Sequence, residues 1–336
     1  MHSVAKEVQN VRENVGAIEV ANFSKHEFKG PDARKFLDHI LAGKLPKQGR
    51  ISLSPMLTYR GKLYGDLTVA CLDENEFMIF GSGAAQEMHR RWFESHISKF
   101  NVKYINRSDD FHGISIAGPK SRDLLQKLVR EDVSNDNFKF RDTKRMFVAG
   151  VPAIVNRISF TGELGYEIYV APHFQLKLYE EIENAGKEFN LKPFGGRALM
   201  SMRLEKSWGA WTLDFRPDFT AKESGLDIFI DWKKDFIGKK SAENDKSNLK
   251  LTPLIVETKD IDVTNNEAVM KDGKSIGYIT SGGYAHYVKK SIAYSYLDET
   301  ICKSNEKFQV EINGDFYDCS IIKQPLYDPK GIKMRS

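Results

Sequence analysis

A local pattern that occurs twice in the first half of the chain limits the possible folds more than any other feature. EFKGPDARKFLDHIL (residues 27–41) and SIAGPKSRDLLQKLV (residues 115–129) each join a strand-like segment, a Gly-Pro turn, a charged helix start and an apolar helical repeat. Gly-Pro pairs interrupt regular structure, and apolar residues three and four apart indicate a helix. The recurrence predicts two related α+β units. The alternative is that Gly-Pro turns recur by chance.

The segments around this repeated pattern also have clear periodicities. Valines at helical spacing predict an N-terminal helix that ends near Gly16. Alternating apolar residues predict antiparallel strands at residues 51–58, 62–72 and 76–83, and later at 111–117, 147–160 and 165–171. Helices are expected at about residues 86–100, 173–189 and 196–207.

The texture of the chain changes after a charged segment, KKSAENDKSNLK (residues 239–250), which is interpreted as a linker. Beyond it the chain has short strands and turns with almost no helical period, typical of an all-β barrel or sandwich. The predicted fold class is α+β. Residues 1–240 hold two α+β units, approximately 1–110 and 111–240 and intertwined, and residues 251–336 form the all-β domain.

Composition excludes several classes of protein. The 50 basic and 46 acidic side chains leave a net charge of +4 with no long block of one sign, so nucleic-acid binding is not supported, whereas a polyanionic small molecule would be attracted. The scattered Cys71, Cys302 and Cys319 indicate neither a disulfide framework nor a metal site, and fit a reducing cytoplasm. With a polar N-terminus and no apolar run of membrane length, the chain is predicted to be cytoplasmic. Phosphate-binding glycine motifs and hydrolase motifs are absent.

Candidate acids stand in two strands. In RISFTGELGYEIYV (residues 157–170), two glycines bracket a turn, and Glu167 alternates with apolar neighbours. A buried carboxylate is costly without hydrogen-bond donors, and a ligand with two adjacent N–H groups, such as a pterin, would supply them. The alternative is an ion pair with the protein's own Arg157. Asp66 follows Tyr64-Gly65 at the start of a strand, where it could be functional or an ordinary turn residue.

Two further segments contain candidate binding residues. Arg197 and Arg203 stand six apart in a predicted helix, and arginine binds carboxylates bidentately, although one of the two is expected to be a structural ion-pair partner. The loop SGGYAHYV holds Tyr284 and Tyr287, which could cover a flat ligand or merely turn a strand. His286 between them is interpreted as a packing or surface residue. These local patterns do not by themselves identify the reaction that the protein catalyses.

Taken in order, the segments resemble the aminomethyltransferase (glycine-cleavage T-protein) superfamily, and the match is closest to the folate-binding half of dimethylglycine and sarcosine dehydrogenases and oxidases. The segments that carry this resemblance span nearly the whole chain: SPMLTYRGKLYGDLTVACL, ISIAGPKSRDLL, RISFTGELGYEIYV, RALMSMRLEKSWGAWTLDF, KKDFIGKKS, SGGYAHYVKKSIAYSYL and PLYDPKGIKMR. The last two favour the dehydrogenase-linked branch over the free T-protein.

The resemblance implies a three-domain cloverleaf, with two ferredoxin-like α+β units, a C-terminal β-barrel and tetrahydrofolate in a central channel within the region of residues 1–240. It implies that Asp66 is catalytic and that Glu167 holds the pterin ring. The remaining cofactor-binding residues that it implies are Tyr166, Phe160, Arg197 or Arg203, Tyr284 and Tyr287. Relatives often carry Tyr at the position of Phe160, so one hydroxyl near the pterin is missing here.

The implied reaction passes a methylene or aminomethyl unit from an N-methylated amine of the dimethylglycine or sarcosine type to tetrahydrofolate, giving 5,10-methylenetetrahydrofolate. A carboxylate can stabilise the cationic nitrogen and take its proton. No flavin is expected in this chain, because the oxidising flavin domain of the dehydrogenases is missing, and the scattered cysteines give no reason to expect a metal. The chain is therefore expected to be a subunit that works with a separate flavoprotein dehydrogenase, or a piece of a longer flavoprotein.

Three alternatives within the superfamily stay open. A folate-dependent S- or O-demethylase would give 5-methyltetrahydrofolate, and a true glycine-cleavage T-protein would work with a lipoyl carrier protein. A non-enzymatic folate-binding factor for iron–sulfur assembly would carry a characteristic cysteine, and the corresponding TGELGYEIY has none.

Overall fold

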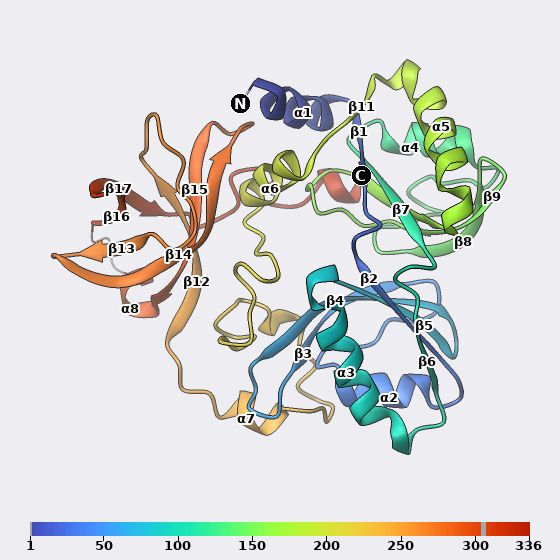
Figure 1. Cartoon of the computed structure of the whole chain (residues 1–336), viewed down its shortest axis with the longest axis horizontal. Coiled ribbons are helices and arrows are strands. Elements are labelled where there is room, and N and C mark those ends of the chain that lie inside the picture. The colour runs from blue at the N-terminus through green and yellow to red at the C-terminus, as the bar shows by residue number, and fades with distance from the viewer. Residues whose placement is uncertain (1, 304–306) are drawn as a thin grey trace.

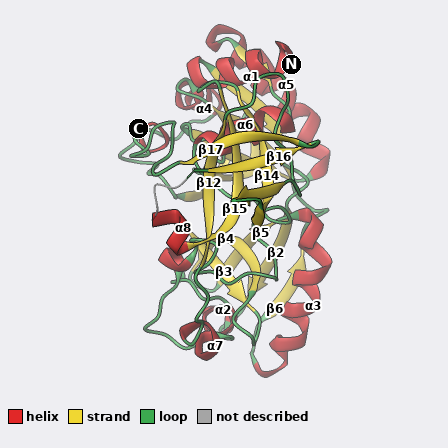
Figure 2. Cartoon of the chain, turned by 90° about the vertical axis from the view of Figure 1, so that its left-hand side faces the viewer, coloured by secondary structure: helices red, strands yellow, loops and turns green. Residues whose placement is uncertain are grey.

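The computed structural model describes residues 2–303 and 307–336, and arranges them as two sheets and a closed barrel around a common centre (Figure 1). Figure 2 shows the strands inside and most helices at the periphery. The predicted fold class, α+β with a C-terminal all-β barrel, is confirmed. Among the described residues, no helix is both long and apolar enough to cross a membrane.

The first sheet has five strands in the order β3-β4-β5-β2-β6 and is called the five-stranded sheet below. Its strands are β3 (Ile51–Leu57), β4 (Leu63–Asp73), β5 (Glu76–Gly81), β2 (Ser24–Lys29) and β6 (Lys103–Asn106). Helices α2 (Ala33–Ile40) and α3 (Gln86–His96) cover one face, because their apolar sides pack with the inward residues of the strands in one buried core. The opposite face is left for other contacts.

The second sheet, called the six-stranded sheet, runs in the order β11-β1-β7-β10-β9-β8. Its strands are β11 (Leu191–Pro193), β1 (Val15–Glu19), β7 (His112–Ala117), β10 (Gly165–Val170), β9 (Val151–Asn156) and β8 (Thr143–Val148). Helices α4 (Ser121–Leu128) and α5 (Gln175–Gly186) cover one of its faces. Because β1 comes from the N-terminal segment and pairs with β7 and β11, distant parts of the chain share this sheet.

The N-terminal helix is shorter than predicted, because the last residues of the predicted helix belong to a strand. Helix α1 ends at Glu13, and Gly16 lies in β1, opposite Ala117. Val15 and Ala17 then point into the core under α4 and α5, so period-two burial prevails over the helical spacing of the valines. A side chain at Gly16 would meet Val11 at 2.5 Å, which shows how closely the strand approaches α1.

The two Gly-Pro turns are built alike. Gly30 and Gly118 both have positive φ, 145° and 135°, and each carbonyl accepts a 3.0 Å hydrogen bond from the backbone N–H three residues later, at Ala33 and Ser121. Glycine is needed at both sites, because an added Cβ would come within 2.8 Å and 2.4 Å of a backbone oxygen. The repeated sequence pattern thus corresponds to a repeated local structure.

The barrel closes in the order β12-β15-β14-β13-β16-β17. Its strands are β12 (Leu249–Val256), β15 (Lys290–Asp298), β14 (Lys274–Ala285), β13 (Ala268–Lys271), β16 (Phe308–Ile312) and β17 (Asp315–Ile321), with the short helix α8 (Glu299–Lys303) at one end. The charged segment interpreted as a linker contains a helical turn, α7 (Lys239–Glu243), because the positive φ of Gly238 starts a new turn there. Short 3₁₀ turns lie at Gly83–Ala85, Ile97–Lys99, Pro172–Phe174, Lys187–Phe189, Asp227–Phe229 and Lys333–Arg335.

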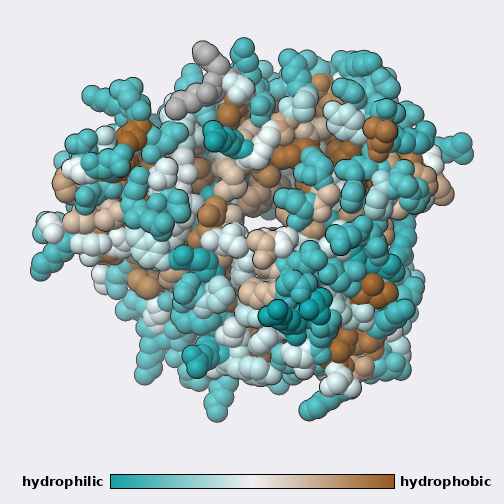
Figure 3. Space-filling model, in the orientation of Figure 1, coloured by the Kyte–Doolittle hydropathy of each residue, from teal (hydrophilic) through white to brown (hydrophobic). Residues whose placement is uncertain are grey.

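Helix α6 (Gly196–Glu205) links the sheets to the barrel, and the chain after it crosses the middle of the molecule before entering α7 (Figure 1). The C-terminal segment returns from the barrel toward the six-stranded sheet. The surface is hollowed at the centre, where the two sheets and the barrel meet (Figure 3). Side chains that face this hollow are therefore the candidates for a binding site.

Candidate active site

The helix-free faces of the two sheets meet in a small apolar cluster. Phe80 of β5 and Tyr169 of β10 stack across the junction, with ring centroids 4.7 Å apart. Thr68 of β4 pairs directly with Phe80, so it belongs to the same face of the five-stranded sheet. This contact gives a reference point for the residues beside it, because side chains two apart along a strand share a face.

Asp66 lies one pleat from Thr68 on this face of β4. Its neighbour Leu67 points the other way, into the core under α2 and α3. Burial raises the pKa of Asp66 to about 7, partly offset by a hydrogen bond from its own backbone N–H. The side chain is half-buried, and among the described residues it has no ion pair and no hydrogen bond with another residue. Its oxygens are therefore open to a ligand.

Glu167 lies one pleat from Tyr169 on the matching face of β10. The Tyr169 hydroxyl donates to Glu167 Oε2 at 2.8 Å, and burial raises the pKa of Glu167 to about 7. The predicted alternative, an ion pair with Arg157, is not formed. Arg157 instead donates from Nη1 to Asn135 Oδ1 at 2.6 Å, away from Glu167.

The two carboxylates thus project from the helix-free faces of the two sheets, which meet at the Phe80–Tyr169 contact. Both have a pKa near neutrality because both are desolvated and neither forms an ion pair among the described residues, although the charge of Lys25 offsets part of the rise at Glu167. Carboxylates in this state can accept hydrogen bonds from a ligand or exchange a proton near pH 7. Within the part of the chain that the structure describes, no group of three or more His, Cys, Asp or Glu side chains could hold a metal ion.

Lys25 is a third charged group at this junction, and the sequence analysis missed it. It lies opposite Phe80 in the β2–β5 pairing, is fully buried, and donates from Nζ to the Ala21 carbonyl at 2.7 Å and the Phe23 carbonyl at 2.8 Å. Burial lowers its pKa to about 8, and Glu167 is among the acids that stabilise its charge. A lysine inside an alternating strand is the signal that could have identified it.

Two predicted binding residues lie elsewhere. Tyr166 is fully buried in the core under α4 and α5, on the opposite face of β10 from Glu167, because adjacent strand residues point to opposite faces. Tyr169 occupies the place beside Glu167. Arg203 is buried as well, and donates from Nη1 to Asp214 Oδ2 at 2.8 Å. It is the structural ion-pair partner expected of one of the two arginines.

The remaining candidates lie around α6. Arg197 is exposed in the first turn, one helical turn before Ser201, whose hydroxyl donates to the Tyr284 carbonyl at 3.0 Å. The backbone N–H of Tyr287 donates to Glu205 Oε1 at 2.9 Å, and the Tyr287 side chain is 41% exposed. Helix α6 therefore holds the tyrosine loop of the barrel in place beside Arg197.

Phe160 lies in the turn that precedes β10. Its ring is half-buried and stacks on Trp208, with centroids 5.9 Å apart and planes 19° from parallel. Trp208 lies three residues after the end of α6, so this stacking links the turn before β10 to the segment that crosses the middle of the molecule.

A buried ionic network fixes these parts relative to one another. Arg12 of α1 donates to Glu163 at 2.9 Å and to Glu205 at 2.6 Å, and all three side chains are almost fully buried. The Tyr327 hydroxyl also donates to Glu163, and the Arg12 guanidinium lies 3.7 Å from the centre of the Tyr327 ring. The network joins α1, the turn before β10, α6 and the C-terminal segment. It gives Glu163 an ion-pair partner, whereas Glu167 forms no ion pair among the described residues.

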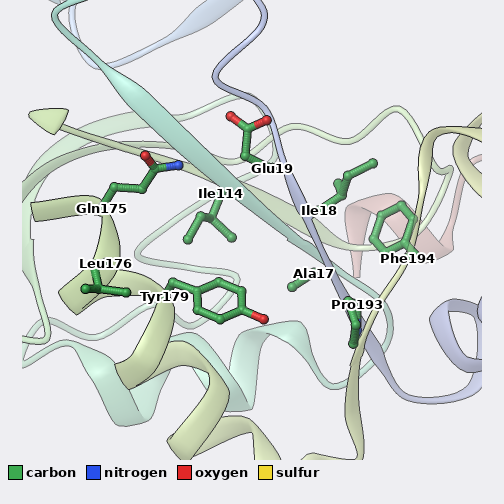
Figure 4. A pocket seen from close by; sticks show the side chains of 9 residues that line it. All are labelled: Ala17, Ile18, Glu19, Ile114, Gln175, Leu176, Tyr179, Pro193 and Phe194. Carbon is green, nitrogen blue, oxygen red and sulfur yellow. The ribbon is translucent and has the colours of Figure 1, made fainter.

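A separate cleft of about 430 Å³ lies beside α5 at the edge of the six-stranded sheet (Figure 4). Ala17, Ile114, Leu176 and Tyr179 make it largely apolar, and Glu19 and Gln175 lie at its rim. Because Ala17 and Ile114 belong to the core under α4 and α5, this cleft is on the other side of the sheet from Glu167. It is not part of the carboxylate site.

The chain matches two family models: the GCVT N-terminal domain over residues 1–234, and the glycine cleavage T-protein C-terminal barrel domain over residues 250–328. It is 38% identical over 331 residues to mitochondrial dimethylglycine dehydrogenase of Mus musculus, covering 96% of this chain and 38% of that protein. It is 30% identical over 334 residues to an aminomethyltransferase of Desulfitobacterium hafniense (strain Y51), covering 98% of this chain and 91% of that protein.

The same fold occurs in the crystal structure of glycine cleavage system aminomethyltransferase T from Bartonella henselae. The TM-score is 0.88 at 21% sequence identity, over 97% of this chain and 90% of that chain. The chain spans 38% of the length of the dimethylglycine dehydrogenase, which is well under half of that relative.

Proposed function

The chain belongs to the glycine cleavage T-protein family of folate-dependent aminomethyltransferases, and we propose that it transfers a one-carbon unit to tetrahydrofolate in the hollow between its two sheets. The observation that carries this proposal is the pair Asp66 and Glu167. Each is a desolvated carboxylate without an ionic partner among the described side chains, and the two stand on facing sheets. Unpaired acids are costly to keep in a fold unless a ligand uses them.

Glu167 is the proposed anchor of the pterin ring. One of its oxygens already accepts the Tyr169 hydroxyl, and the acceptor sites that remain suit a ligand edge with two adjacent N–H donors. Such donors stabilise the ionised carboxylate and lower its pKa from about 7. The flat, partly apolar junction beside Phe80 and Tyr169 favours an aromatic heterocycle.

Asp66 is the proposed catalytic carboxylate. When a folate nitrogen attacks an electrophilic one-carbon unit, that nitrogen becomes positively charged and must lose a proton. The second folate nitrogen then closes the ring and expels water or the donor amine. Asp66, ionised, stabilises the cation and accepts this proton. A base with a pKa near 7 is well matched to this task at neutral pH, and such a group contributes about 10²–10⁴-fold to a rate.

Arg197, Tyr284 and Tyr287 are the proposed contacts for the rest of the folate molecule. Arg203 is committed to Asp214, whereas Arg197 is exposed and has no ion pair among the described residues. A carboxylate tail would pair with its guanidinium. The tyrosine loop is held by α6 next to it, so both sides of an extended ligand could be covered.

The proposed donor is an N-methylated amine of the dimethylglycine or sarcosine type, which gives 5,10-methylenetetrahydrofolate. Its support is the 38% identity to dimethylglycine dehydrogenase. Because the chain spans only part of that relative, oxidation of the amine is assigned to a flavoprotein portion or partner. A second candidate is aminomethyl transfer of the glycine-cleavage type, supported by the 30% identity to the aminomethyltransferase over 91% of its length.

The test uses purified protein, tetrahydrofolate and formaldehyde, with 5,10-methylenetetrahydrofolate as the measured product. Asp66→Asn is expected to keep folate affinity and lose about 10²–10⁴-fold in turnover. Glu167→Gln is expected to weaken folate binding. Asp136→Asn, which changes an exposed aspartate, is the matched control and should behave like the wild type. Unchanged turnover in Asp66→Asn would defeat the proposed role.

A further inference from the structure

His89 is a buried histidine of α3 that stands directly behind the strand segment bearing Asp66. It is 1% exposed, and its Nε2 lies 2.9 Å from the carbonyl oxygen of Tyr64, two residues before Asp66. Burial lowers its pKa to about 4, so the ring is neutral near pH 7. Because a carbonyl only accepts, Nε2 must carry the hydrogen, and the ring is fixed in one tautomer.

Tyr64 is an irregular residue in its strand. In the pairing of β3 with β4, Gly65 lies opposite Met56 and Leu63 lies opposite Leu57, which leaves Tyr64 as the inserted residue of a β-bulge. A bulge bends its strand and re-aims the side chains that follow. The bulge therefore helps to set the direction in which Asp66 leaves the sheet.

Gly65 makes room for this contact. A Cβ at this position would stand 3.1 Å from His89 Nε2, closer than side chains normally approach. On its other side the His89 ring lies 5.9 Å from Trp211, in the segment after α6. The histidine is thus wedged between the bulge and the chain that crosses the centre of the molecule, with its donor hydrogen on the Tyr64 carbonyl.

We propose that His89 is a positioning residue for Asp66: its Nε2–H holds the Tyr64 carbonyl and so fixes the bulge that aims the carboxylate at the substrate. This inference rests on the proposed catalytic role of Asp66. His89 touches no substrate, and its effect passes through two residues of backbone. A displacement of a catalytic group by about 1 Å can cost about 10²-fold in rate, so the contact is large enough to matter.

The test compares His89→Phe, which keeps a ring but removes the donor, with His89→Gln, whose side-chain amide can donate to the same carbonyl. Phe93→Leu is the matched control, because Phe93 is a fully buried residue one turn later on the same helix. His89→Phe is expected to lower kcat about 10- to 100-fold with unchanged folate affinity. His89→Gln should recover kcat to within about threefold of the wild type, since it restores the hydrogen bond.

Two results would overturn the inference: equal losses of kcat in His89→Phe and Phe93→Leu, or a kcat in His89→Gln as low as in His89→Phe. If His89→Phe does not fold, Gly65→Ala replaces it as the test. The methyl group added at residue 65 would press against His89 Nε2 and displace the histidine ring. In that case a kcat equal to the wild type overturns the inference. Asp66→Asn is measured alongside. Full activity in Asp66→Asn would refute the proposed function, whereas loss there with full activity in His89→Phe would refute only the positioning role.

Discussion

Replacement of Asp66 by Asn should stabilise the folded protein above neutral pH while it removes activity. Burial raises the pKa of this carboxyl from 3.8 to about 7 in the folded state. A carboxyl with a raised folded pKa holds its proton more tightly when folded, so the folded state loses stability as pH rises from about 4 to about 7. Above that range the full cost is present, and Asp66→Asn removes it.

The size of this effect follows from the shift in pKa. At about 1.4 kcal/mol per pH unit, a rise of roughly three units corresponds to an upper limit of roughly 4 kcal/mol. The side chain is half-buried rather than sealed, so water screens part of this cost, and we expect about 1–2 kcal/mol at pH 8.5. Near pH 4.5 the folded protein is protonated at Asp66 and the difference should shrink to a few tenths of a kcal/mol, roughly a quarter of its value at high pH.

The assay is urea unfolding of the wild type and Asp66→Asn at both pH values, with the free energy of unfolding extrapolated to water. The exposed Asp136→Asn is the control and should leave that free energy nearly unchanged at either pH. The reasoning is refuted if Asp66→Asn is less stable than the wild type at pH 8.5, or if the two differ by the same amount at both pH values. Either result would mean that the carboxylate is not held at a cost.

Three further predictions concern the same parts of the molecule. The kcat for formaldehyde-dependent turnover should rise with pH through about 7, because Asp66 must be ionised to accept a proton. The rise should persist in Glu167→Gln, and a flat profile from pH 5.5 to 8.5 would contradict the assignment of Asp66 as the base. Tyr169→Phe removes the hydrogen-bond donor to Glu167 and raises the pKa of that carboxyl, so folate affinity in a titration should fall about tenfold at pH 7 and less at pH 8.5. An equal loss at both pH values would contradict binding of folate by the ionised form of Glu167. Arg12→Met leaves Glu163 and Glu205 buried without their cation, so the free energy of unfolding measured in urea should fall by about 3–5 kcal/mol. Loss of an exposed ion pair costs under about 1 kcal/mol, and a change of that smaller size would contradict the buried network.

Local periodicity predicted most elements of the fold because each depends on neighbours in the sequence. Helices α2 and α4 and the strands before them follow from the repeated Gly-Pro pattern, and the positive φ of Gly30 and Gly118 gives the physical reason for that pattern. Strand β1 was missed because Val15 continues the helical spacing of the valines in α1. Only pairing with β7 and β11, far along the chain, decides between the two.

The candidate site shows the same division. Strand alternation singled out Glu167 as a candidate, and the same alternation places Tyr169 rather than Tyr166 on its face of the strand. The commitments of Arg203 to Asp214 and of Glu163 to Arg12 could not be predicted, because the partners are 11 and 151 residues apart and no local pattern links them. Whether an acid is available to a ligand or is already used in an ion pair depends on these distant partners. Only the three-dimensional structure shows them.

Glu163 in the turn before β10 and Glu167 in β10 have different surroundings, although they are only four residues apart. Both are carboxylates in a single 14-residue motif, and both lose most of their contact with water. Glu163 receives a guanidinium and a phenol, so its charge is neutralised inside the protein and ties four segments together. Glu167 receives one phenol and forms no ion pair among the described residues, and burial raises its pKa to about 7. Glu167 is the more informative of the two for the proposed function, because a desolvated carboxylate that forms no ion pair among the described residues is costly to the fold.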